Sequence, residues 1–584
     1  MAPLAGLKSD GESQDLALLP LSGQEQEKDE QFQDAFEVIP AAPTMSLLAS
    51  LEECTTGLYL FLNNRFSEAL RLIYPWSQSS LYHALMHSVL MVVKAALTLE
   101  PQDIEAGLLA AKSALRTCGR FRRRSRASFG RLVSLREEEL HAELCYAESL
   151  LLKSAASFIQ DDSLLSYLRG GLAIGSSYQI LRDCQRALAQ MPAPRSETFR
   201  HLAGGVQFGL GLFNLLLPLV PPKTLRLLSV SGQAGDREAG LQLLGQSAAE
   251  PHLSSVLSAL LLLFYHGYVD VALGPERAPD AAVERLLRAS CRRFPNCVLL
   301  KFFRARFCVL AGQLAEARLR LHECVFVQSE WTQVHHLCYW ELMWCSVFLQ
   351  NWRQAFHYAR LLARHSRWSR AVYVYSKAAL LALLPADFAR LVGEDASSLF
   401  LQVASLRIKV FGTSVPIEKF IAEKGQRYGA TTGWYPAQPM LELIYAWSGF
   451  RVMSKKLDLI AHWLAVIDKG EDLLRGHASA NAEYWADDVT LLFLLKGLCL
   501  KHLGRYLMAE HYFNCVLQRE KLLKHDHYLV PYTHYELGVL YYLKGDYANA
   551  AKSLDNIKNY RDYSMESQLQ FRAHVAFEQI YKEL

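Results

Sequence analysis

KGLCLKHLGRYLMAEHYF (496–513) and LGVLYYLKGDYANAAKSL (537–554) are two copies of one pattern, and this pattern decides the fold. Each copy predicts a helix, a glycine-marked turn and a second helix. The glycine in the first helix lets a neighbour approach closely, the glycine at the turn suits a helix end, and the alanine is a small residue where two helices cross. The matching positions are 41 residues apart and are Gly497 and Gly538, Gly504 and Gly545, Tyr506 and Tyr547, and Ala509 and Ala550.

The pattern is typical of the tetratricopeptide repeat, a helix hairpin with a usual period of about 34 residues. The longer spacing predicts an insertion of about seven residues around LLKHDHYLVP (522–531). Weaker copies occur upstream, in residues 57–73, 301–321 and 339–359. We find no alternating apolar and polar pattern with hairpin turns that would predict β-strands instead. The sequence therefore predicts an all-α protein, an α-solenoid of degenerate tetratricopeptide-like helix hairpins with extra N-terminal helices.

Composition divides the chain into segments of different character. Nine acidic residues among the first 40, against two lysines, predict that residues 1–44 form a disordered acidic tail. The later segments are an N-terminal helical region (45–200) with an Arg-rich loop (116–136), a central buried helical layer (201–270), divergent repeats (281–385), linking helices (386–490) and a C-terminal repeat pair (491–584).

HLAGGVQFGLGLFNLLLPLVPP (201–222) contains no Asp, Glu, Lys or Arg, and PHLSSVLSALLLLFYHGYV (251–269) is a second uncharged stretch. Two such stretches could form a pair of membrane spans. In the first, however, Gln207 and Asn214 interrupt the apolar run and prolines end it, which leaves a helix of about 18 Å. Its glycines do not complete a dinucleotide or phosphate-loop motif. We expect buried, closely packed helices, and the membrane pair is the alternative.

The chain shows no pattern of an enzyme, so we predict no catalytic, metal or cofactor site. His83 and His87 have the i, i+4 spacing of metal ligands, but the HExxH glutamate and further ligands are missing, so core histidines are expected. Twelve cysteines without a CxxC pair, and no secretory signal, predict a reducing, cytoplasmic setting. A net charge of +4 is small for this length, so nucleic acid is not an expected partner.

Binding residues are expected on the first helices of the C-terminal repeats, which line the inner surface of a solenoid. Tyrosine combines a large apolar face with a hydroxyl and is favoured in binding surfaces. The candidates for binding a protein partner are Lys501, Tyr532, Tyr535 and Tyr542. The alternative is that these tyrosines pack between helices.

RTCGRFRRRSRASFGR (116–131) contains seven arginines, and like charges this dense predict a loop or a frayed helix end. The run could dock acidic partners or phosphoinositide headgroups, serve nuclear import, or present Ser125 or Ser128 to a kinase. A solvated linker that balances the acidic tail is the alternative. The candidates for anion docking are Arg120, Arg122, Arg123, Arg124 and Arg126.

Several blocks outside the generic repeat resemble the tetratricopeptide repeat protein 39 family. They are FLNNRFSEAL (61–70), HAELCYAESLL (141–151), GVQFGLGLFNLLLPLVPPKTLRLL (205–228), HHLCYWELMWC (335–345), DHYLVP (526–531) and DYSMES (562–567). The resemblance implies a soluble, intracellular, all-helical adaptor without established catalytic chemistry, in a family with links to lipid homeostasis and to the clearing of protein aggregates.

We therefore predict a non-enzymatic scaffold or adaptor that mediates protein–protein interaction in the cytoplasm, in lipid homeostasis or protein-quality pathways. The alternative is a peripheral membrane or lipid-droplet protein that docks through the Arg-rich loop or an apolar hairpin.

Overall fold

The structure is a computed structural model that describes residues 45–122, 136–160, 164–191, 196–219, 235–274, 281–410, 413–430, 438–476 and 483–583. All of them belong to one unit, Met45–Leu584. The predicted acidic tail (1–44) and most of the predicted Arg-rich loop (123–135) lie outside the described residues.

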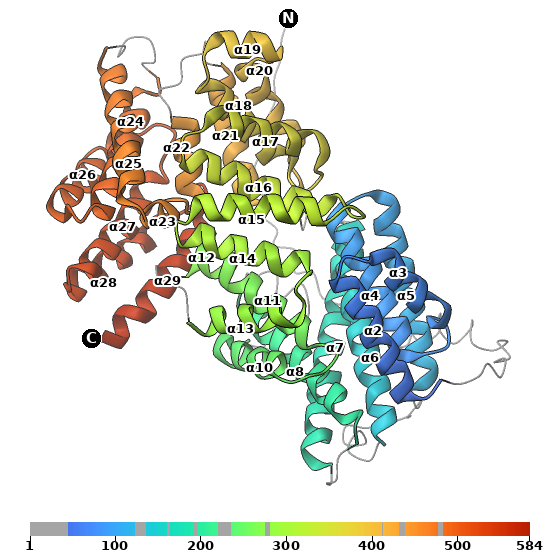
Figure 1. The fold of residues 1–584 in the computed structure, drawn as a ribbon. Coiled ribbons are helices and arrows are strands. Elements are labelled where there is room, and N and C mark those ends of the chain that lie inside the picture. The colour runs from blue at the N-terminus through green and yellow to red at the C-terminus, as the bar shows by residue number, and fades with distance from the viewer. Residues whose placement is uncertain are drawn as a thin grey trace, which may run out of the picture. The chain divides into compact units, whose positions relative to one another are not determined.

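Helices make up most of the described chain, and helices that follow one another in sequence pack side by side (Figure 1). The N-terminal part consists of α2 (Leu47–Leu62), α3 (Phe66–Ile73), η1 (Tyr74–Trp76), α4 (Leu81–Thr98), α5 (Pro101–Phe121), α6 (Glu137–Gln160), α7 (Leu164–Gln190), α8 (Phe199–Leu216) and η3 (Leu217–Leu219). The middle part consists of α10 (Arg237–Ala249), α11 (Ser255–Phe264), the π-helix η4 (Tyr265–Val269), α12 (Asp270–Leu273), α13 (Ala281–Arg293), α14 (Val298–Leu310), α15 (Leu314–Val327), α16 (Gln333–Phe348), α17 (Trp352–His365) and α18 (Arg370–Ala382).

The C-terminal part continues the array. It consists of α19 (Ala386–Val392), α20 (Ala396–Gln402), η5 (Val403–Leu406), β1 (Lys409–Val410), β2 (Thr413–Ser414), α21 (Pro416–Ala430), α22 (Gln438–Ala446), α23 (Phe450–Met453), α24 (Leu457–Gly476), α25 (Trp485–His502), α26 (Tyr506–Gln518), η6 (Glu520–Leu522), α27 (Leu529–Leu543), α28 (Tyr547–Asn556), η7 (Ile557–Asn559) and α29 (Glu566–Glu583). The two short strands pair antiparallel, with Lys409 opposite Ser414. The predicted all-α class is confirmed.

Six connections between helices share one turn geometry. In each, one residue has a left-handed backbone, and the next N–H donates to the carbonyl five residues earlier at 2.8–3.0 Å. This is the Schellman ending, which satisfies the last carbonyls of a helix. The next helix begins two residues after the left-handed residue. The left-handed residues are Asn64, Gly312, Gln350, Ser448, Gly504 and Gly545, with φ between 57° and 77°.

Three of these turns carry the glycine that the repeat pattern predicts, and three do not. Glycine adopts a positive φ without steric cost, and asparagine tolerates it better than most residues. Gln350 and Ser448 adopt it as well, so neighbouring contacts hold the turn where the sequence signal is absent. The turn at Ser448 lies within 386–490, the segment predicted as linking helices.

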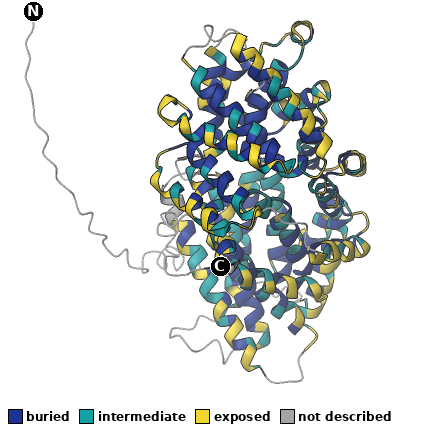
Figure 2. Cartoon of the chain, turned by 90° about the vertical axis from the view of Figure 1, so that its left-hand side faces the viewer, coloured by how far each residue is buried: buried dark blue, intermediate teal, exposed yellow. Residues whose placement is uncertain are grey.

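The hairpins pack as the small residues predict. A Cβ added to Gly497 would lie 2.5 Å from the ring of Phe513, and one added to Gly538 would lie 2.7 Å from Leu554. Only a glycine permits this approach between the two helices of a hairpin. The alanine of the second helix is fully buried in all five predicted copies, at Ala69, Ala317, Ala355, Ala509 and Ala550. The apolar core therefore follows the array, as the buried positions in Figure 2 show.

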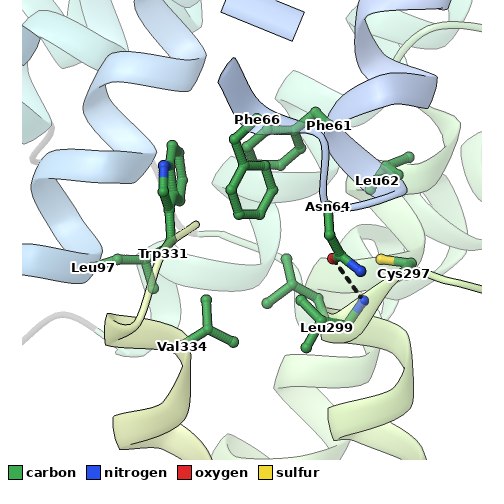
Figure 3. Close-up of a pocket in the computed structure, with 10 residues that line it drawn as sticks. Phe61, Leu62, Asn64, Phe66, Leu97, Cys297, Leu299, Trp331 and Val334 are labelled. Carbon is green, nitrogen blue, oxygen red and sulfur yellow. Dashed lines mark hydrogen bonds between the residues drawn. The ribbon is translucent and has the colours of Figure 1, made fainter. Parts of the chain in front are cut away.

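Hairpin α2/α3 packs against α14 although more than 200 residues separate them in sequence. The Val298 N–H at the start of α14 donates to Asn64 Oδ1 at 3.3 Å, drawn as a dashed line in Figure 3, and Asn64 Nδ2 donates to the Asn296 carbonyl at 2.7 Å. Ser67 donates to Glu330 from both its backbone N–H and its hydroxyl. Asn64 thus forms the turn after α2 within one hairpin and caps α14, the first helix of another.

Aromatic rings fill the same joint. Phe66 lies 4.1 Å from the Trp331 ring centroid, and Phe61 lies 4.7 Å from that of Phe66 (Figure 3). The void that remains beside them has about 10 Å³, which is close to the space of one water. This joint is a packed interior contact and not a ligand site.

The apolar stretch that begins at residue 201 forms most of α8, which packs against α6, α7 and α10. Two of its glycines face leucines of those helices: an added Cβ would lie 2.6 Å from Leu144 at Gly205 and 2.7 Å from Leu181 at Gly209. Two other described helices, Leu81–Thr98 and Ser255–Leu273, are long and apolar enough to cross a bilayer by length and composition.

A buried ion pair holds the second of these apolar segments against the repeats. Arg306 of α14 donates from Nε to the Gly267 carbonyl at 3.0 Å and from Nη1 to Glu341 Oε2 of α16 at 2.9 Å. The Tyr268 hydroxyl in η4 donates to the other Glu341 oxygen at 2.8 Å. Glu341 is fully buried, so each of its oxygens depends on one of these partners.

Candidate functional site

Three of the four predicted partner-binding residues are in the interior. Tyr532, Tyr535 and Lys501 are 2%, 6% and 4% exposed, respectively. Tyr542 is half-buried beside Tyr547, with 5.7 Å between their ring centroids. Side chains this deeply buried do not contact a partner in this conformation, so the prediction of a binding surface at Lys501, Tyr532 and Tyr535 is corrected.

Contacts between successive first helices explain this burial. Lys501 of α25 donates to Glu536 Oε2 of α27 at 2.7 Å, and both side chains are 3% exposed. Arg572 of α29 lies 4.4 Å from the centre of the Tyr535 ring. A buried charge is stable only with a partner, and Glu536 is the partner of Lys501. Lys501 therefore joins two repeats and is not a ligand-binding residue. The alternative, that the tyrosines pack between helices, holds for Tyr532 and Tyr535.

A second charged cluster is also an internal joint. Lys424 donates to Glu442 at 2.6 Å and to Asp526 at 2.7 Å, while Arg427 pairs with Asp526 at 2.9 Å and with Asp488. Burial alone would raise the pKa of Asp526, but the two cations hold it below its ordinary value. The cluster joins α21, α22 and α25 to the connection before α27, the region where an insertion was predicted. All five charges are partnered within the chain.

The predicted Arg-rich docking run is described only at its start. Arg122 forms two hydrogen-bonded contacts with Glu143, at 2.9 and 2.8 Å, and lies 3.9 Å from the centre of the Tyr146 ring. Its charge is therefore used inside the fold, and Arg122 is not available as a docking residue. Arg120 is exposed in the last turn of α5. The remaining candidates, Arg123, Arg124 and Arg126, lie outside the described residues.

The histidine pair considered as a metal site has partners of its own. His83 Nδ1 lies 2.9 Å from the Ser80 hydroxyl, and burial lowers the pKa of His83 to about 4. The His87 ring packs against Tyr74. Over the described ranges, no group of three His, Cys, Asp or Glu side chains is arranged to hold a metal ion.

An open groove of about 800 Å³ lies between α13, α14 and α15, which follow one another in Figure 1. Its floor is apolar and comes from Val283 and Leu287 of α13, Phe307 of α14 and Ala311 at the end of α14. Pockets of 300–1,000 Å³ are typical binding sites, and an apolar floor favours burial of a ligand. This groove is the candidate functional site.

Arginines dominate the rim of the groove. Two of them pair with glutamates one helical turn away, Arg288 with Glu284 at 2.9 Å and Arg320 with Glu316 at 2.5 Å. Arg292 and Arg304 are exposed and form no ion pair with any described residue. The site therefore presents positive charge over an apolar floor.

Thiol chemistry does not explain the groove. Cys291 lines it, and burial raises the pKa of this thiol although Arg304 and Lys301 lie near it. A reactive cysteine needs a lowered pKa, so Cys291 lacks the property of a nucleophile. The groove is suited to non-covalent binding.

Sequence reasoning missed this site. The segment AAVERLLRASCRR (281–293) carries arginines on one side of an amphipathic helix, and that pattern was the available signal. An amphipathic helix with charged residues is usually an ordinary solvated helix, so the pattern by itself does not identify a groove.

An all-α array of tetratricopeptide-like hairpins defines the class of helical repeat proteins. Within this class, the chain belongs to the Iml2/Tetratricopeptide repeat protein 39 family. The sequence model of this family matches residues 55–503. The chain is 31% identical over 558 residues to Tetratricopeptide repeat protein ttc-39B of Caenorhabditis elegans, covering 94% of this chain and 95% of that protein.

Proposed function

We propose that the protein is a non-enzymatic scaffold that binds another protein in the groove between α13, α14 and α15. The observation that carries this proposal is the groove itself: it offers about 800 Å³ of accessible space on an array that buries three of the four residues predicted to bind a partner. Repeat proteins use extended helical surfaces for binding, and membership of this family supports a role in protein–protein interaction.

The setting that we propose for this scaffold is cytoplasmic. Buried cysteines without disulfides support it for the described residues, since thiols remain reduced in the cytosol. The family resemblance supports a role in lipid homeostasis or in protein-quality pathways. Depletion of the protein should then change cellular neutral lipid or the turnover of an aggregating substrate, and a cell in which both are unchanged would refute this setting.

Peripheral docking on a membrane or lipid droplet is the second candidate. The apolar segments Leu81–Thr98 and Ser255–Leu273 favour it by composition. The hydrogen bonds of Tyr268 to Glu341 and of Arg306 to the Gly267 carbonyl oppose exposure of the second segment, because its release would break both and leave one oxygen of the buried Glu341 carboxylate without its donor. Flotation of the purified protein with liposomes separates the two candidates: comigration with the lipid supports docking, and sedimentation without lipid supports the scaffold alone.

Site-specific photo-crosslinking in cells tests the scaffold. A benzophenone amino acid at Ala311, an exposed alanine in the groove, should crosslink to a partner protein. The matched control is the same amino acid at Ala548, an exposed alanine on α28. The crosslinked peptides are then mapped by mass spectrometry. Equal crosslinking at both positions, or none at Ala311, would refute the groove as the docking surface.

A further inference from the structure

We propose that the groove between α13, α14 and α15 receives an amphipathic α-helix of a partner protein whose apolar face is flanked by Asp or Glu side chains. The proposal rests on the scaffold function and adds to it the chemistry of the partner.

The length of the groove fits a short helix. On α13 the lining residues run from Val283 to Arg292, and along α15 they run from Gln313, the residue before the helix, to Arg320. At 1.5 Å per residue these stretches are about 13 Å and 10 Å long. An amphipathic helix that binds through positions i, i+3 or i+4, and i+7 spans about 10 Å. Two turns of such a helix therefore match the length of the groove.

The floor accounts for the apolar face of the partner. Phe307 of α14 and Ala311, the residue after α14, are accessible in the groove, and Leu287 of α13 also lines it. Burial of these atoms under leucine or phenylalanine side chains is favourable because it removes apolar surface from water. A ligand with charge alone would leave this floor exposed.

The rim accounts for the acidic flanks. Arg292 and Arg304 are exposed and lack an ion-pair partner among the described residues, and Arg288 and Arg320 pair only with glutamates of their own helices. Such surface pairs are weak, so an incoming carboxylate can share these arginines. Arginine also binds carboxylates through two parallel hydrogen bonds. Complementary charge would then orient the helix and speed its association.

An anionic lipid headgroup is the competing ligand for an arginine-rich surface. The arginines here lie on three different helices around an apolar floor, so their charges are spread along the groove. A headgroup needs convergent donors around one phosphate, whereas a helix carries its carboxylates along its length. The structure therefore favours the peptide, and lipid binding becomes an outcome of the experiment.

Fluorescence anisotropy with the full-length protein tests the proposal. The peptide is a labelled helix of about 18 residues with leucines at i, i+3, i+4 and i+7 and glutamates on both sides of them. A second peptide carries lysine in place of every glutamate. The protein variants are Arg292→Glu/Arg304→Glu, Ala311→Trp to block the floor, and Arg285→Glu as control, because Arg285 is exposed on α13 but does not line the groove.

The acidic peptide should bind the wild-type protein, more weakly as salt rises from about 0.05 to 0.5 M. Binding should fall about tenfold or more in the double variant and in Ala311→Trp, and remain unchanged in Arg285→Glu. Since all substituted residues are exposed, unchanged thermal unfolding shows that each variant folds.

Equal binding of the acidic and basic peptides, no binding of either, or insensitivity to the double substitution would overturn the proposal. So would binding to phosphoinositide vesicles that the double substitution abolishes. Crosslinking at Ala311 is a separate readout: if it persists while the acidic peptide fails, the scaffold stands and only the partner chemistry is wrong.

Discussion

Replacing Arg306 by methionine tests how the π-helical segment η4 is held to the repeats. The substitution removes the hydrogen bonds to Gly267 and Glu341 and leaves the fully buried Glu341 carboxylate with only the Tyr268 hydroxyl. Breaking a buried pair in this way costs about 3–5 kcal/mol. At about 1.4 kcal/mol per factor of ten, a cost of about 3 kcal/mol corresponds to amide exchange on the order of a hundred times faster where local opening controls it.

Hydrogen-exchange mass spectrometry of peptides from α14, η4 and α16 measures this cost. The triple variant Tyr268→Phe/Arg306→Met/Glu341→Leu removes every polar side chain of the cluster and should regain most of the lost protection, because no charge is then left unpaired. Arg288→Met is the matched control: its ion pair with Glu284 is more than 60% exposed on both sides, and its loss should cost less than about 1 kcal/mol. A loss below about 1 kcal/mol in Arg306→Met, or a triple variant as unstable as the single one, would refute the reasoning.

Three further predictions concern the fold. Gly497→Ala should destabilise the folded protein by about 1–3 kcal/mol, because the added Cβ meets the Phe513 ring. Gly245→Ala is the control: it has open space around it and should be neutral or stabilising in thermal unfolding. The same effect at both sites would contradict the packing argument. Asn64→Gly keeps the turn but loses the cap of α14, so hydrogen exchange at the start of α14 should accelerate for a loss of about 1 kcal/mol; unchanged exchange would remove this role. Burial raises the pKa of Glu148 to about 8, so the contribution of Glu148 to stability is complete below the unfolded pKa of about 4.3 and is lost as pH rises through 8. Glu148→Gln should therefore flatten the fall of the melting temperature between pH 5 and 8. An equal slope in the wild-type protein and the variant would exclude this contribution.

The repeat hairpins could be predicted from sequence because their signals are local. In the two C-terminal hairpins, a glycine at a positive φ, an aromatic residue two positions later and a buried alanine all act within one hairpin. The same signals are incomplete where Gln350 and Ser448 occupy the left-handed position. At those turns the packing of whole helices outweighs the preference of a single residue, and a pattern search finds only a weak copy or none.

The candidate site could not be predicted in the same way. Tyr532 and Tyr535 have the composition of a binding surface, but Arg572 and the neighbouring helices cover them. Arg292 and Arg304 have the composition of an ordinary solvated surface, but they border a groove. Exposure depends on which helices meet, and residues far apart in sequence decide that.

The sequence by itself determined the helical class and the glycine-marked hairpin turns, because helix periodicity and turn chemistry are encoded over a few neighbouring residues. It also determined the family, through the sequence blocks outside the generic repeat. Only the tertiary structure decided which charges are buried and which are free to bind. Lys501 and Arg304 are both basic residues of first helices in tetratricopeptide-like hairpins, yet one is fully paired with Glu536 and the other lines an open groove. The physical reason is that the cost of burying a charge, and the partner that offsets it, depend on contacts between distant helices.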